Sequence, residues 1–165
     1  MRILDITYPD VNNGTGFRVT LWVSGCSHRC KGCHNPETWD FNAGHEFCDD
    51  DKKVLFNALG NDYIKGLTLS GGDPICSYGG VLNLVCEIKE KFKDKDIWLF
   101  TGFTKEEMDD KYNEILKYID VLVDGKFIEE EKDLSLAFRG SRNQRIWVKG
   151  DNDDFFVVDD DYFKN

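Results

Sequence analysis

Between residues 18 and 148, short apolar segments with the composition of β-strands alternate with longer segments whose apolar residues have helical spacing. This alternation predicts parallel strands with covering helices, an α/β fold. A closed eightfold barrel needs about 250 residues, and this chain has 165. We therefore expect an incomplete, open β/α barrel, with a mostly parallel, curved sheet covered by helices. The expected strands are 18–23, 66–70, 97–100, 121–123 and 146–148, and the expected helices are 49–59, about 79–93, and 105–118.

Four of the expected strands are followed by loops of unusual composition. The first loop carries three cysteines within residues 26–33, and the second reads Gly71-Gly72-Asp73-Pro74. The third and fourth begin with Thr101-Gly102 and Asp124-Gly125. In α/β folds, ligands bind at the carboxyl ends of the strands. We therefore expect these four loops to meet at one edge of the sheet and to form the site.

The three cysteines of the first loop, Cys26, Cys30 and Cys33, are close enough in sequence for their thiolates to reach one metal centre. Three protein ligands suit an iron–sulfur cluster with one open iron, because structural metal sites normally have four. Zinc is an alternative, with His28 or His34 completing a three-cysteine, one-histidine site. Common zinc modules bring ligands in two separated pairs, and no second pair follows here. A loop of buried thiols without metal fits poorly, because the residues between the cysteines are polar.

The remaining composition limits the class of protein. Six cysteines invite a disulfide interpretation, but Cys48, Cys76 and Cys86 are scattered, and small secreted proteins use cysteine more densely. We expect reduced thiols and a cytoplasmic protein, because an acidic residue interrupts residues 1–5 before a signal-peptide core could form. No apolar run reaches the about 18 residues of a membrane span. The formal net charge of -10 disfavours binding to nucleic acid or anionic lipid.

The glycine pair at Gly71 and Gly72 would let the main chain approach a ligand, although a plain strand-to-helix turn also explains it. Combined with the C-x-x-x-C-x-x-C spacing of the first loop, this turn resembles that of the radical S-adenosylmethionine enzymes. Further segments resemble the activases of glycyl-radical enzymes, at residues 13–18, 21–26, 33–36 and 38–39. Others are similar to the activating proteins of anaerobic ribonucleoside-triphosphate reductase, at residues 96–103, 121–127 and 139–144.

This resemblance covers about residues 6–144 and implies a radical-SAM type barrel. We expect a radical S-adenosylmethionine domain over residues 1–150 and an acidic C-terminal tail over 151–165, either frayed, packed or used for docking. The resemblance implies that Cys26, Cys30 and Cys33 each bind one iron of a 4Fe-4S cluster. The amino and carboxylate groups of S-adenosylmethionine would bind the fourth iron.

The resemblance also assigns the contacts of S-adenosylmethionine. Gly71 and Gly72 would offer their main chain to the methionyl amino group, and Asp73 stands where many relatives have glutamate. The adenine would lie beside the main chain of the segment Gly32-Cys33-His34, although a solvent-facing His34 is the plainer alternative. From the same resemblance we expect Gly72→Val to block cofactor binding without unfolding the protein.

The implied reaction is reductive cleavage of S-adenosylmethionine. A reduced flavodoxin-type protein would donate an electron through the cluster, giving methionine and a 5′-deoxyadenosyl radical. That radical would abstract a hydrogen atom from a glycine in the large subunit of anaerobic ribonucleoside-triphosphate reductase. The resemblance also implies a homodimer or a complex with the reductase dimer. The rival functions are an activase of another glycyl-radical enzyme, such as pyruvate formate-lyase, and a non-enzymatic zinc-binding module.

Two charged residues outside these motifs are further candidates. Asp124 ends an expected strand at the presumed mouth and could meet cofactor or substrate, although Asp-Gly is also a common turn. Arg18 lies beside the loop that contains Gly14 and Gly16 and could open the rim for an incoming glycine. A solvated or structurally paired arginine is the plainer expectation.

Overall fold

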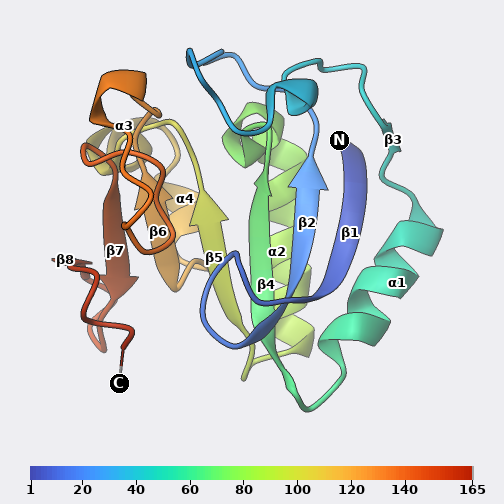
Figure 1. Cartoon of the computed structure of the whole chain (residues 1–165). Coiled ribbons are helices and arrows are strands. Elements are labelled where there is room, and N and C mark those ends of the chain that lie inside the picture. Colours follow the sequence, from blue (N-terminus) through green and yellow to red (C-terminus); the bar gives the residue numbers. More distant parts are fainter. Residues whose placement is uncertain (165) are drawn as a thin grey trace.

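The computed structural model describes residues 1–164, and their strands form one open sheet in the order β3-β1-β2-β4-β5-β6-β7-β8 (Figure 1). The strands are β1 Arg2–Asp10, β2 Phe17–Val23, β3 His45–Glu46, β4 Ile64–Gly71, β5 Asp96–Phe100, β6 Val121–Asp124, β7 Arg145–Lys149 and β8 Phe155–Val158. All five predicted strands are confirmed, each extended by a few residues. The strands β1, β3 and β8 were not predicted.

The centre of the sheet is parallel, as the alternating pattern predicts. Strands β2, β4, β5 and β6 are parallel neighbours, whereas β1 and β3 on one side and β7 and β8 on the other pair antiparallel. The carboxyl ends of the four central strands therefore share one edge, at the top of Figure 1.

Helices follow the strands in the predicted order. They are α1 Asp49–Leu59, α2 Tyr78–Lys91, α3 Lys105–Lys111 and α4 Asn113–Leu116. The prediction of α1 is confirmed at both ends; its first turn is acidic, and Asp51 accepts a hydrogen bond from the main-chain N–H of Cys48 at 2.9 Å. The prediction of one helix over 105–118 is wrong, because the main chain leaves helical geometry at Tyr112, whose ring packs against Phe103 and Tyr78.

The two faces of the sheet bury different apolar clusters. On β5, Ile97 and Leu99 belong to the main core with residues of α1, α2 and α4, while Trp98 belongs to a smaller cluster on the opposite face. This division follows from the alternation of side chains along a strand. In Figure 1, α2 lies behind β4, and the loop between β1 and β2 crosses in front of it. Loops, rather than helices, therefore cover the face that carries Trp98.

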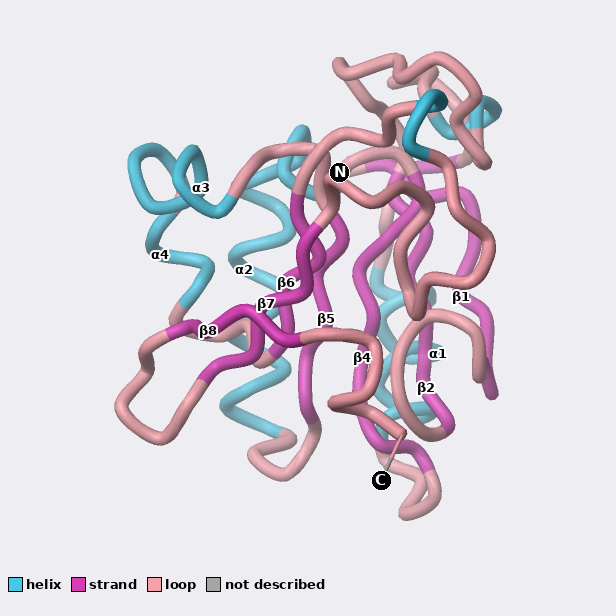
Figure 2. Tube along the Cα trace, turned by 60° about the vertical axis from the view of Figure 1, so that its left-hand side comes forward, coloured by secondary structure: helices cyan, strands magenta, loops and turns pink. Residues whose placement is uncertain are grey.

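The C-terminal segment is part of this second face. Strand β8 pairs with β7, and Figure 2 shows the chain after β8 running across the view of β5. The Phe163 ring lies 5.3 Å from the ring of Trp98. The segment 151–164 is therefore anchored through β8 and Phe163, although residues 151–154 are exposed. The final residue of the predicted tail, Asn165, lies outside the described residues. No helix among the described residues is long and apolar enough to span a membrane.

Candidate active site

The loops after β2, β4, β5 and β6 enclose a cavity of about 140 Å³ at the shared edge of the sheet. The three predicted cluster ligands, Cys26, Cys30 and Cys33, all line it, together with Gly71 and Gly72. Residues more than 35 positions apart in sequence thus meet where the parallel strands end. The structure therefore brings together the cysteine loop and the glycine turn, as the α/β pattern predicts.

The three thiols are free and partly withdrawn from solvent. Burial raises the pKa of Cys26 to about 11, although the main-chain N–H groups of His28 and Arg29 lower it. Burial likewise raises the pKa of Cys30. The main-chain N–H of Asn35 donates to the sulfur of Cys33 at 3.4 Å. Such N–H donors stabilise sulfur in its thiolate form, the form that binds iron.

This donor set fits an iron–sulfur cluster. Three soft thiols line one cavity, and thiolates are the ligands that such clusters use. Within residues 1–164, no group of three or more His, Cys, Asp and Glu side chains lies close enough to hold a single metal ion. His28, one candidate for a fourth zinc ligand, is hydrogen-bonded through Nε2 to Asp73 at 2.8 Å. The other candidate, His34, is exposed, with its ring 6.0 Å from that of Phe127.

The glycine turn touches the cysteine loop directly. Gly71 has φ of +111°, where a side chain would be strained, and a Cβ on Gly72 would lie 2.4 Å from the carbonyl oxygen of Gly25. The main-chain N–H of Gly72 donates to Val23 O at 2.8 Å, and that of Asp73 donates to Gly25 O at 2.9 Å. The expectation that Gly72→Val would only obstruct the cofactor is therefore wrong. A side chain there would separate the two loops.

The Asp73 carboxylate is fully buried and is used within the protein. It accepts hydrogen bonds from the Ile75 main-chain N–H at 2.9 Å, the Thr101 hydroxyl at 2.9 Å and the Gly102 main-chain N–H at 2.9 Å. Its fourth donor is His28 of the cysteine loop. Asp73 thus joins the loops that follow β2, β4 and β5, so that any contact with a cofactor would come from its main chain.

A larger cavity of about 540 Å³ adjoins the first and shares Cys33 and Phe127 with it. His34 lines this second cavity, whereas Gly32 lines neither cavity. Gly32 has φ of +74°, and a Cβ there would meet the Glu129 carboxylate at 2.9 Å. The two connected cavities give room for a ligand that extends from the thiols along the sheet face.

Comparison with known proteins decides the family. Residues 12–147 match the family model described as a 4Fe-4S single cluster domain. An anaerobic ribonucleoside-triphosphate reductase-activating protein from Vibrio cholerae is 51% identical, and the alignment covers 84% of this chain and 93% of the relative. The chain belongs to this family of activating proteins. Similarly named proteins of phage T4 and Escherichia coli are 45% and 44% identical, over 89% and 84% of this chain and 94% of each relative.

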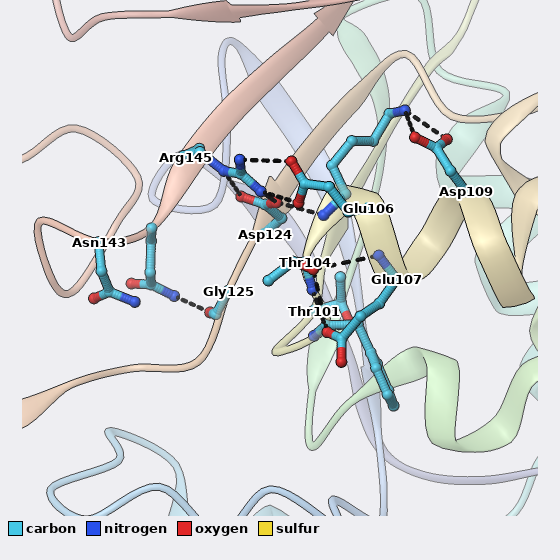
Figure 3. Close-up of polar contacts among 12 residues, drawn as sticks. Thr101, Thr104, Glu106, Glu107, Asp109, Asp124, Gly125, Asn143 and Arg145 are labelled. Carbon is cyan, nitrogen blue, oxygen red and sulfur yellow. Dashed lines mark hydrogen bonds and ion pairs between the residues drawn. The ribbon is translucent and has the colours of Figure 1, made fainter.

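Within this member of the activating-protein family, Asp124 and Arg18 have structural partners. Asp124 is buried and accepts hydrogen bonds from the Lys105 main-chain N–H at 2.6 Å and from Arg145 at 2.5 Å (Figure 3). Arg18 is also buried, at the amino ends of the strands, and its Nη2 lies 2.5 Å from the Asp96 carboxylate. These contacts agree with the plainer expectation for each residue: a structural role in the turn for Asp124, and a structurally paired side chain for Arg18.

Several residues that line the larger cavity were not predicted from the sequence to belong to the site. They are Asn12, Asn13, Trp22, Phe100, Phe138, Arg139 and Gln144. Arg139 and Gln144 lie in segment 139–144, one of those that carry the family resemblance, which is the signal that could have marked them. Among the described residues, the buried Nε of Arg139 has no hydrogen-bond partner.

Proposed function

We propose that this chain is a radical S-adenosylmethionine activase that generates the glycyl radical on the large subunit of anaerobic ribonucleoside-triphosphate reductase. The observation that carries the proposal is that Cys26, Cys30 and Cys33 line one cavity with the Gly71–Gly72 turn. Membership of the activating-protein family supports the choice of reductase. The 4Fe-4S family model supports the choice of cluster.

The chain's residues would hold and shield the reactive groups. The thiolates of Cys26, Cys30 and Cys33 would bind three irons of the 4Fe-4S cluster, and Gly71 and Gly72 would present carbonyl oxygens to the methionyl ammonium of S-adenosylmethionine. His34 would lie beside the adenine. The chemistry supplied by the cluster and S-adenosylmethionine when bound is reductive C5′–S cleavage and removal of a hydrogen atom from a glycine of the reductase.

Burial of the cysteines also has a role in this proposal. Cys26 is 8% exposed, so water has little access to the ligand at the inner end of the cavity. A thiol must lose its proton to bind iron. Because the pKa of Cys26 is raised to about 11, binding of the metal, rather than the pH of the solvent, would drive the loss of this proton. We also propose, on the family resemblance, a cytoplasmic protein with a flavodoxin-type electron donor, acting as a homodimer or with the reductase.

The test is anaerobic reconstitution with iron and sulfide, followed by measurement of iron per chain and of S-adenosylmethionine cleavage. Cys26→Ala, Cys30→Ala and Cys33→Ala should each abolish cleavage. The matched control is Cys48→Ala, which changes an exposed cysteine outside the cavity and should cleave normally. Normal cleavage by any of the first three variants would exclude that residue as a ligand.

The substrate is tested separately by electron paramagnetic resonance. Incubation with S-adenosylmethionine, reductant and the anaerobic reductase should give a carbon-centred doublet, and incubation with pyruvate formate-lyase should not. A doublet only with the lyase would support the rival activase function. One tightly bound zinc without visible absorption would support the zinc-binding module.

A further inference from the structure

We propose that His28 is a positioning residue for the iron–sulfur site, which fixes the cysteine loop to Asp73 and so determines how firmly the cluster is held. The inference rests on the proposed function, because it assumes that Cys26 and Cys30 are cluster ligands. His28 lies midway between them in sequence. It would act on the cluster through the loop rather than by binding iron.

His28 differs from its neighbours in the loop by its burial. Ser27, Arg29 and Lys31 are exposed, whereas the His28 side chain is only 7% exposed. Its ring packs edge-on against Phe103 with the ring centroids 4.6 Å apart. The loop therefore inserts one polar side chain into the protein between two of its cysteines.

The space for this imidazole depends on a glycine of another loop. A Cβ added to Gly102 would lie 2.4 Å from the ring carbon Cδ2 of His28, closer than nonbonded atoms can approach. Gly102 has no left-handed φ that would itself demand glycine. The absence of a side chain at position 102 is thus explained by the His28 ring.

The partner of His28 is rigid. The Asp73 carboxylate is held by the turn that it caps and by Thr101 and Gly102 beyond β5. Because a carboxylate can only accept hydrogen bonds, the 2.8 Å contact assigns His28 the tautomer with its proton on Nε2. A hydrogen bond to a charged, buried acceptor is among the stronger ones in proteins. His28 therefore ties the exposed loop to the carboxyl ends of two central strands.

The other side-chain contacts of this segment are weaker. The Ser27 hydroxyl lies 3.5 Å from the sulfur of Cys76, and the second contact is an ion pair. Lys31 pairs with Glu129 at 2.8 Å, but their side chains are 82% and 42% exposed. Exposed ion pairs contribute little to stability, because water and salt screen the two charges. The left-handed φ of +48° at Arg29 shows that the main chain beside His28 is in a conformation that few residues adopt. The His28–Asp73 bond is well placed to maintain that conformation.

Loss of this tie should loosen the cluster. Removing groups that orient metal ligands typically costs about 10- to 100-fold in metal affinity or activity. In His28→Ala we expect the reconstituted cluster to be lost to a chelator at least about tenfold faster than in the wild type. The midpoint potential of the cluster should also shift, because hydrogen bonding and solvent exposure around the sulfurs set it. His28→Gln, which keeps an N–H donor, should restore much of the difference.

The matched control is His45→Ala. His45 makes the same kind of hydrogen bond, from Nε2 to the Asp51 carboxylate at 2.9 Å, but it is exposed on β3 and does not line the cavity. This variant should lose its cluster at the wild-type rate. Melting temperatures of the cluster-free proteins show whether His28→Ala remains folded.

Gly102→Ala provides a second, independent variant. In the wild-type background it should displace the His28 ring and accelerate cluster loss, whereas added to His28→Ala it should have much less effect, because the ring is already gone. Wild-type chelation rates and potential in His28→Ala, or additive effects of the two changes, would overturn the positioning role. A wild type and His45→Ala that bind no cluster would instead overturn the proposed function.

Discussion

At the scale of single residues, Asp124 and Glu106, near the carboxyl edge of the sheet, share one partner within the protein. Arg145 donates to Glu106 at 2.9 and 2.7 Å and to Asp124 at 2.5 Å, so that one guanidinium joins the start of α3 to the end of β6 (Figure 3). Neither carboxylate is needed as an acid or base in the proposed reaction. These contacts hold the start of α3 against the end of β6 at the carboxyl edge of the sheet.

The Glu106–Arg145 contact predicts a measurable titration. Its hydrogen bonds from Arg145 lower the pKa of Glu106 from 4.5 to about 2. Because the folded-state pKa is depressed, the stabilisation is fully present above about pH 4.5 and is lost as the pH falls towards 2. In Arg145→Gln, carboxyl carbon NMR should show the pKa of Glu106 rising from about 2 towards 4.5, since hydrogen bonds within the first turn of α3 still lower it.

Glu107 is the internal control for this titration. Its pKa is lowered first by the main-chain N–H of Thr104, so it should not move in Arg145→Gln. Equal movement of both residues would show a general change of the helix terminus instead of the loss of one partner.

At the scale of elements, Arg18 joins the central strands at the end opposite the cysteines. It donates to the Thr68 hydroxyl at 2.7 Å and to the Leu67 carbonyl at 2.7 Å, and its charge is paired with Asp96. These partners lie on β4 and β5. Arg18 therefore links β2, β4 and β5 by hydrogen bonds and an ion pair. These contacts are directional, which the packing of apolar side chains is not.

Arg18→Met should destabilise the protein by about 3 kcal/mol, because it leaves a partly buried carboxylate and a carbonyl without their donor. Urea unfolding measures this change. The control is Arg142→Met, which removes an ion pair to Asp133 from a side chain that is 71% exposed and should change the free energy of unfolding far less than Arg18→Met. Similar losses in the two variants would contradict the structural role of Arg18.

The elements also show what local sequence can predict. The limits of α1 follow from its acidic first turn and apolar spacing, and the parallel centre follows from the strand–helix alternation. Strand β8 was not predicted, because it lies in an acidic segment and becomes a strand by pairing with β7. The bond between His28 and Asp73 joins residues 45 positions apart. Such a contact depends on how loops far apart in sequence pack against each other. A local sequence pattern carries no information about that packing.

At the scale of the whole molecule, the C-terminal segment supports the wall of the larger cavity. Phe163 packs against Trp98 and, at 5.7 Å, against Phe138. Asp160 pairs with Arg139 and accepts a hydrogen bond from the Ala137 main-chain N–H at 3.2 Å. Phe138 and Arg139 line the cavity. The last residues of the chain therefore fix side chains at a site built mainly by the first 150.

Together with the proposed function, this support predicts that Asp160→Ala weakens the binding of S-adenosylmethionine. Freeing Arg139 should cost about 1 kcal/mol, or about fivefold in Kd, because a side chain that lines the cavity becomes mobile. Calorimetry on the anaerobically reconstituted protein measures the change. Asp159→Ala is the matched control, since Asp159 is exposed and its carboxylate accepts only the local main-chain N–H of Asp161 among the described contacts. Equal affinities in the two variants would show that the segment stabilises the sheet without shaping the cavity.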